Sequence, residues 1–489
     1  MRSITATCVI FLLAAASALA QGNGSSAPSE GTSAATISPG SIITMEQALG
    51  LAAKSGLQTQ LNELNLEIAR SANAQVHAQS SIGLSGNAGV SRTTPFGAAA
   101  KAASGATISA LAGTVATDAA SAGVSLAVPN GGASPTTNLS LKGTQSLSET
   151  DPIYHQTSVT ASINQTIWDG YPGFRNRINI GIADVTLQQK VLAAEAAAQT
   201  LLYQVKQSYY SVASAQDAVA LDTKILTQRE RDYAQTKTLY DAGQATAVDL
   251  QQADVNRYSA ELDLNDANSA LKESQVSLSL LMGVPPESQY SVQAPSPLSP
   301  PVQSLQQLTD TALRQRVDLQ QILLTSKINS LQTTYDKTAS SPVVTANAGI
   351  TYGYIWNNSQ DTGSWNAGVQ VTVPIVDSGT AAAQVQQAKL QQRSTDIQIA
   401  QLKQTIAQTV QTDYDSVRSL SARVNLAQQN LSVSQRQYQL TEIQFRQGTK
   451  SQLDVLTAAV TSSTAETALQ KAKTQLQLAI IKLANDLGE

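Results

Sequence analysis

The chain has 489 residues, of which only 13% are charged and 42% are hydrophobic, and its formal net charge is −4. A nucleic-acid-binding domain needs a concentration of basic residues, so this composition excludes that class. The hydrophobic fraction is too high for a chain that is disordered throughout. The length by itself allows two or three domains.

The first twenty residues have the features of a secretory signal peptide. An apolar run begins at Val9 and is followed by Ala18-Leu19-Ala20, which predicts cleavage before Gln21. A lipoprotein cysteine would follow that run, but Cys8, the only cysteine, precedes it, so we expect no lipid anchor. The rest of the chain lacks the run of ~18 apolar residues that a membrane helix needs. Residues 21–41, rich in Gly, Ser, Ala and Thr, are predicted to be a flexible mature N-terminus.

The mature chain contains two copies of one unit, predicted at 42–283 and 304–489. A shift of 205 residues aligns their C-terminal parts without a gap. The aligned pairs include Tyr209 with Tyr414, Tyr233 with Tyr438, Gly243 with Gly448, Asp249 with Asp454, and Gly283 with Gly488. Between the two repeats, residues 284–303 are rich in proline and are expected to form an extended linker.

The first repeat is longer than the second because of one insertion. The N-terminal parts of the repeats align at a shift of 260 residues, and the shift then falls to 208, which leaves 52 extra residues in the first repeat. They fall within a long segment at about 93–156, which is dominated by Ala, Gly, Ser and Thr. We expect an insertion at one loop and not a domain.

Two runs in each repeat alternate between apolar and polar residues, as strands with two different faces do. Each run is about ten residues long, which is the length of a strand in a transmembrane β-barrel. A half-buried sheet of a soluble domain would show the same alternation. Four strands cannot close a barrel, since the smallest single-chain barrels have about eight, so a membrane location would require several chains to share one barrel. The expected strands are at about 82–92, 157–168, 343–356 and 365–376.

Long helical patterns follow the second strand of each repeat. They cover about 174–241 and 380–446, and ~67 helical residues extend ~100 Å. A helix of that length needs helical neighbours along its whole length. Shorter helices are expected to return from the tips and to precede the strands, at about 247–282, 452–487, 44–79 and 304–338.

The turns at 240–249 and 445–454 are predicted to be the tips of helical hairpins. Gly243 and Gly448 suit the position after a helix C-terminus, where φ is positive. Thr246-x-x-Asp249 and Ser451-x-x-Asp454 both have the spacing of a capping box at the start of the returning helix.

Residues for catalysis or metal binding are scarce. The chain has only two histidines, His77 and His155, far apart in the sequence and with no cysteine near them. No nucleophile elbow, P-loop or dinucleotide-binding fingerprint is present. We therefore expect no enzyme activity, no catalytic residues, no metal site and no cofactor.

In its organisation the chain resembles the TolC-like outer-membrane efflux protein family (the outer membrane factors). The resemblance covers the repeated order strand, strand, long helix, tip and helix, together with the proline-rich linker. Its most specific part is the stretch from Gly448 to Leu456. The resemblance implies an α+β fold. Long α-helical hairpins would form a periplasmic helical barrel, and four β-strands per chain would contribute to a 12-stranded transmembrane β-barrel in a homotrimer.

The same resemblance implies a passive exit duct of a tripartite efflux or type I secretion system, for small molecules or secreted proteins. Its partners would be outer-membrane lipid, a periplasmic adaptor protein and an inner-membrane pump of the RND, ABC or MFS type, with no nucleic acid. The tip residues Gly243, Gly448, Thr449 and Ser451 would contact the adaptor. The alternative is a structural or adaptor-like periplasmic coiled-coil protein, which would need no lipid-facing strands.

The resemblance also places a periplasmic gate at the tips, at Asp249, Phe445, Lys450, Asp454 and Thr457. Well-known members have a tyrosine in place of Phe445, an arginine in place of Lys450 and an aspartate in place of Thr457. Phe445 lacks the hydroxyl that would reach Asp249, and Lys450 retains the charge without the bidentate geometry of arginine. A Lys450–Asp249 contact would be a weaker lock. The alternative role of the two aspartates is helix capping, which needs no gate.

Overall fold

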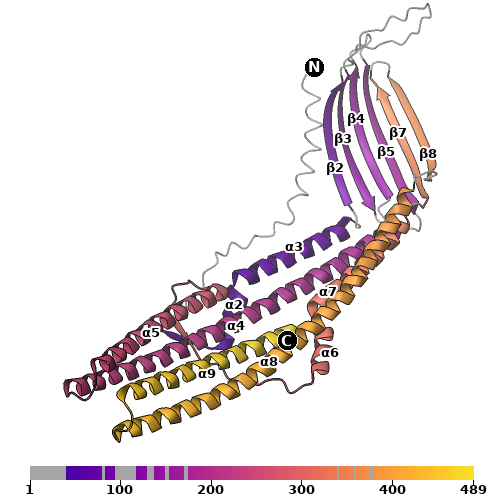
Figure 1. Ribbon diagram of the computed structural model, residues 1–489. Coiled ribbons are helices and arrows are strands. Elements are labelled where there is room, and N and C mark those ends of the chain that lie inside the picture. The colour runs from indigo at the N-terminus through magenta and orange to yellow at the C-terminus, as the bar shows by residue number, and fades with distance from the viewer. Residues whose placement is uncertain are drawn as a thin grey trace, which may run out of the picture. The chain divides into compact units, whose positions relative to one another are not determined.

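The computed structural model (Figure 1) describes residues 40–79, 83–93, 117–128, 137–148, 154–169, 174–338, 341–356, 359–373 and 379–488. The expected signal peptide, most of the expected flexible N-terminus and parts of the insertion lie outside these residues. The chain divides into two compact units. The sheet unit contains 69–187 and 326–394, and the helical unit contains 31–68, 188–325 and 395–489.

The sheet unit is built on one curved antiparallel sheet (Figure 1). Within the described residues the sheet has six strands, in the order β2-β3-β4-β5-β7-β8. A bulge between Thr166 and Trp168 shifts the register of β5 against β7. The strands are β2 (Gly83–Thr93), β3 (Thr117–Val128), β4 (Thr137–Ser148), β5 (Tyr154–Asp169), β7 (Val343–Ile355) and β8 (Gln360–Thr372).

The expectation of four strands per chain is wrong. The four expected segments correspond to β2, β5, β7 and β8, but the segment at about 93–156, expected to be a loop insertion, contributes β3 and β4. These two strands form a hairpin that lies between β2 and β5 in the sheet. The physical reason is the alternation of residues along these two segments, because successive side chains of a strand point to opposite faces. Apolar residues recur at every second position, at Val124 and Leu126 on β3 and at Leu139 and Leu141 on β4, with small or polar residues between them.

Two long helices dominate the rest of the chain. Helix α4 (Phe174–Asp241) has 68 residues and α8 (Thr380–Arg446) has 67. Each is followed, after a short turn, by a returning helix of 36 residues, α5 (Ala247–Met282) or α9 (Gln452–Leu487). The absence of proline and the high content of Ala, Gln and Leu favour uninterrupted helix over these lengths.

The helices that precede the strands are each divided in two. The expected helix at 44–79 is α2 (Met45–Ser55) and α3 (Leu57–Gln79), and the one at 304–338 is α6 (Leu305–Gln315) and α7 (Val317–Lys337). The breaks fall at Gly56 and Arg316, whose backbones are extended. Both α2 and α6 begin with a capping box, from Thr44 and Ser304.

One stretch of the proline-rich linker takes part in a two-stranded sheet. Its proline-free residues Tyr290–Val292 form β6, which pairs in parallel with β1 (Ser41–Ile43). The hydroxyl of Tyr209 fixes this pair to α4, because its one proton is shared between the carbonyl oxygens of Ile43 at 2.9 Å and Gln293 at 2.8 Å. One hydrophobic core of the helical unit forms here, and a second lies among α6, α7, α8 and α9.

Candidate functional site: the hairpin tips and the two faces of the sheet

The two tips have the same backbone geometry. Gly243 and Gly448 have φ of 73° and 75°, in the left-handed region that glycine adopts without steric cost. In the first tip the amide of Gln244 donates to the carbonyl of Leu239 at 2.8 Å, and in the second the amide of Thr449 donates to that of Gln444 at 3.0 Å. These bonds satisfy carbonyls that would otherwise be left free at the ends of α4 and α8.

Both predicted capping boxes are present. The amide of Thr246 donates to Asp249 Oδ2 at 2.8 Å, and the amide of Asp249 donates back to the Thr246 hydroxyl. Ser451 and Asp454 repeat this arrangement at the start of α9, with 2.9 Å between the Ser451 amide and Asp454 Oδ2. Hydrogen bonds from Ser451, together with the nearby Lys450 ammonium, hold the pKa of Asp454 below its usual value.

The other candidate gate residues lie at the second tip. Lys450 Nζ is 3.8 Å from Asp454 Oδ1, so within this chain the structure brings two of the predicted residues together. Phe445 is half-buried, and Thr457 is exposed and donates to the carbonyl of Leu453 at 2.8 Å. An exposed ion pair such as Lys450–Asp454 is worth about 0–1 kcal/mol.

A polar seam between α4 and α9 joins the two hairpins, and the sequence did not reveal it. Near the tips, Gln452 Nε2 donates to Thr236 Oγ1 at 3.1 Å, and both side chains are buried. Further along, Arg229 donates to the Ser463 hydroxyl at 2.5 Å, and its guanidinium lies 3.3 Å from Asp232. No single-sequence signal distinguishes these residues from the other Gln, Ser and Thr residues of the helices. Three more polar pairs complete the seam: Lys224–Glu466, Asp217–Gln470 and Ser214–Thr474.

One face of the sheet is apolar and open. The register of the strands places apolar side chains opposite one another on this face, and these side chains are exposed, as Trp365 is to 79%. A water-soluble protein rarely leaves so much contiguous apolar surface uncovered. The larger exposed members are Leu84, Val90, Val124, Leu141, Val159, Ile163, Ile350, Tyr352, Trp365 and Val369.

The opposite face is lined with hydroxyl and amide side chains and glycine. Cross-strand hydrogen bonds connect Ser85 with Ser125 at 2.5 Å and Ser140 with Ser162 at 2.6 Å. One row across all six strands holds Asn87, Gly123, Lys142, Thr160, Thr351 and Ser364. The two faces of the sheet therefore differ in polarity, one being apolar and the other polar.

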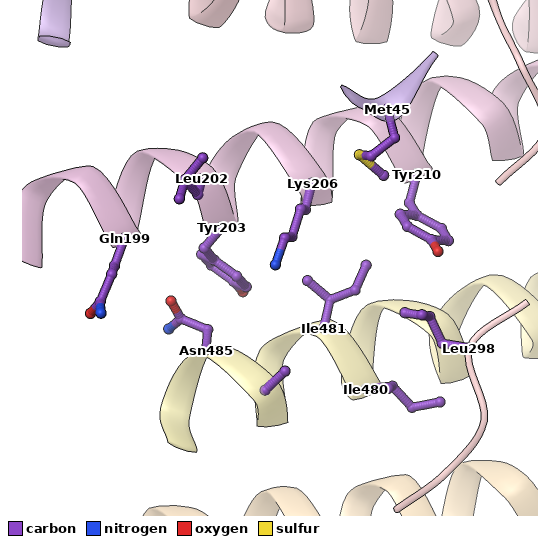
Figure 2. Close-up of a pocket in the computed structure, with 11 residues that line it drawn as sticks. Met45, Gln199, Leu202, Tyr203, Lys206, Tyr210, Leu298, Ile480, Ile481 and Asn485 are labelled. Carbon is purple, nitrogen blue, oxygen red and sulfur yellow. The ribbon is translucent and has the colours of Figure 1, made fainter. Parts of the chain in front are cut away.

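A pocket of about 340 Å³ lies in the helical unit, between α4 and α9 (Figure 2). Tyr203 and Lys206 point from α4 toward Ile481 and Asn485 of α9. Burial raises the pKa of the Tyr203 hydroxyl. The lining is mostly apolar, and we assign this pocket no ligand.

The described residues hold no group of three or more His, Cys, Asp or Glu side chains arranged to bind a metal ion. His77 Nε2 lies 2.8 Å from Asp184 Oδ1, which also accepts from Asn73 at 2.9 Å. The hydrogen bond from Asn73 is the main reason that the pKa of Asp184 is lowered. In the part of the chain that the structure describes, none of the helices is both long and apolar enough to cross a membrane.

Paired helical hairpins with capped tips and a sheet with one apolar and one polar face define a channel-type membrane protein. The chain belongs to the outer membrane efflux protein family, whose model matches residues 111–284 and 308–489. Members of this family are channels and not enzymes.

Two characterised relatives have related sequences. The chain is 24% identical to outer membrane efflux protein BepC of Brucella suis over 339 residues, which cover 68% of this chain and 72% of that protein. It is 22% identical to outer membrane protein TolC of Escherichia coli over 63% of this chain and 64% of that protein.

Solved structures share the fold. The structure of CusC superposes with a TM-score of 0.70 at 16% identity and covers 94% of this chain and 96% of that one. The outer membrane protein VceC from Vibrio cholerae gives 0.67 at 16% identity, over 91% and 96% of the two chains.

Proposed function

We propose that the chain is the outer-membrane exit duct of a tripartite efflux or type I secretion system, and that three copies form one channel. The observation that carries this proposal is the sheet with one exposed apolar face and one polar face, on a chain of the outer membrane efflux protein family. In a barrel, these faces would contact lipid and an aqueous lumen. The sheet lies in the outer membrane with its apolar face toward lipid. The hairpins form a periplasmic tunnel, and the two halves of the chain are repeats of one unit.

The edges of the sheet support assembly from several copies. Strands β2 and β8 each have one unpaired edge within the described residues, and they run in opposite directions because neighbouring strands are all antiparallel. Backbone groups in lipid must be hydrogen-bonded, so both edges need partners. Pairing β8 of one copy with β2 of the next continues the antiparallel pattern, and such a head-to-tail contact closes a ring when the rotation from copy to copy returns to the first one.

The tips of the hairpins are the contact surface for a periplasmic adaptor, which connects the duct to an inner-membrane pump. The contact residues are Gly243, Gly448, Thr449 and Ser451, and the pump supplies the energy. The gate consists of Phe445, Lys450, Asp454 and Thr457, with Asp249 on the facing hairpin. Lys450 contributes by exchanging its partner Asp454 for Asp249 of a neighbouring hairpin. The chain is exported by a cleaved signal peptide.

The test is fractionation of cells that express the full chain, followed by native mass measurement of the solubilised protein and conductance recording in planar bilayers. We expect a trimer in the outer-membrane fraction that forms discrete channels. A monomer in the soluble periplasmic fraction would contradict the proposal and favour the alternative, a structural or adaptor-like periplasmic protein.

A further inference from the structure

The inserted hairpin β3–β4 is an integral part of the sheet and does not lie over it. β3 pairs with β2 along the full length of that strand, from Thr93 opposite Thr117 to Gly83 opposite Ala127. β4 pairs with β5 from Ser148 opposite Tyr154 to Thr137 opposite Gln165. Among the described strands, β2 therefore has the hairpin as its sole partner, and β5 has the hairpin on one edge and β7 on the other.

The hairpin also continues both faces of the sheet without a break. On the apolar face, Val124 of β3 is followed across the sheet by Leu141 of β4, Ala161 of β5 and Ile350 of β7. On the polar face, the row of serines runs from Ser85 through Ser125 and Ser140 to Ser162. Because the side-chain period of a strand is two, a slip of one residue would exchange the faces, so this match is a strong constraint on where the hairpin lies.

Lys142 is the exception on the polar face. Among the strand side chains that the structure describes, it is the only charged one on this face, and it is exposed. It lies midway along β4, opposite Gly123 on one side and Thr160 on the other. Neither neighbour in its row carries a charge, and Gly123 has no side chain to cover the lysine.

We propose that β3–β4 forms part of the membrane wall and that Lys142 extends its ammonium group into the aqueous lumen, where it makes permeation selective for anions. The inference rests on the proposed channel function. Three copies of a six-stranded sheet give eighteen strands and place three Lys142 side chains in one ring. Rings of basic side chains select for anions in pores. Barrels of 16–18 strands leave an aqueous channel, and diameter grows roughly in proportion to strand number.

The first experiment tests where the hairpin lies. Cys8, in the expected signal peptide, is the only cysteine, so single cysteines can be labelled in outer membranes with a membrane-impermeant maleimide. Lys142→Cys and Leu141→Cys are neighbours on opposite faces of β4, and Asn366→Cys and Trp365→Cys are the matching pair on β8. We expect Lys142→Cys and Asn366→Cys to label at least severalfold faster than their apolar-face neighbours.

The two pairs separate the possible failures. If the cysteines at 365 and 366 label at different rates but those at 141 and 142 label at the same rate, the placement of the hairpin is overturned and the channel function stays intact. Equal labelling at 365 and 366 would overturn the proposed function, and this inference with it.

The second experiment tests the charge. Reversal potentials are recorded for purified channels in a potassium chloride gradient. We expect anion preference for the unmodified chain, a shift toward zero for Lys142→Gln and a shift to cation preference for Lys142→Glu. Lys54→Gln, which removes an exposed lysine of α2, is the matched control and should leave the reversal potential unchanged. A reversal potential that is the same in all four proteins would overturn the role of Lys142.

Discussion

Gln452 of α9 donates a buried hydrogen bond of 3.1 Å to Thr236 of α4, which connects the second helical hairpin to the first close to the tips. The Thr236 hydroxyl in turn donates to the carbonyl of Asp232 at 2.7 Å. Removing one partner of a buried bond leaves the other without a replacement from water, so these positions are sensitive to substitution.

Gln452→Ala is expected to lower the free energy of unfolding by about 1 kcal/mol, because it removes a buried hydrogen bond while the Thr236 hydroxyl keeps its bond to the carbonyl of Asp232. The measurement is urea unfolding of the solubilised protein. Gln470→Ala is the matched control, since Gln470 is on the same helix and donates to Asp217 at a more exposed point of the seam. Equal losses in the two variants would contradict a special role for the bond near the tips.

Gly283→Ala should destabilise the chain much more than Gly243→Ala. Both glycines have positive φ, which costs an alanine roughly 1–2 kcal/mol. A Cβ on Gly283 would also lie 2.2 Å from the carbonyl oxygen of Ser55, whereas one on Gly243 would meet nothing within 4 Å. We expect a loss of roughly 3 kcal/mol or more at Gly283. Thermal unfolding of both variants checks this, and similar melting temperatures would contradict it.

Lys450→Ala should raise the fraction of time that the channel is open in planar bilayers. The ion pairs of an exposed lysine are worth about 1 kcal/mol at most, so the increase should be roughly fivefold or less. Arg446→Ala is the control, because Arg446 lies near the same tip and pairs with Glu442 of its own helix. If neither variant alters gating, or both do so equally, Lys450 is not part of a gate.

The Asp454 cap should make stability depend on acidity. The pKa of Asp454 is lowered in the folded chain, chiefly by the hydrogen bond from the Ser451 amide. The contribution of this carboxylate to the free energy of unfolding is therefore present above the unfolded pKa of about 3.9, and it is lost as the pH falls through the lower folded pKa. We expect the unmodified chain to lose more stability between pH 6 and pH 3 than Asp454→Asn. Urea unfolding at both pH values measures the difference, and parallel losses would contradict it.

Lys482→Met should cost roughly 2–3 kcal/mol of stability, because Lys482 donates to Asp413, a carboxylate whose side chain is only 5% exposed. The double variant Lys482→Met with Asp413→Leu should recover much of the loss, since the buried Asp413 carboxylate that lost its partner is then absent. Urea unfolding of the single and double variants tests this. A double variant no more stable than the single one would show that packing, and not charge pairing, holds these helices together.

The sequence by itself determined the local elements of this protein. The bounds of α4, α5, α8 and α9 follow from long patterns free of proline that end at Gly243, Gly283, Gly448 and Gly488. The capping boxes at Thr246 and Ser451 were predicted for the same reason: both partners lie within four residues, so their contact depends only on helix geometry.

Tertiary structure alone decided which segments lie side by side. The hairpin β3–β4 carries a visible alternation at Val124, Leu126, Leu139 and Leu141, but its many Ala, Gly and Ser residues give a weak strand signal. Its place between β2 and β5 depends on pairing between distant segments, and so do the Gln452–Thr236 bond and the position of Lys142 on the polar face. Such contacts are selected by the packing of the whole sheet or helix pair, and no local pattern in the chain encodes them.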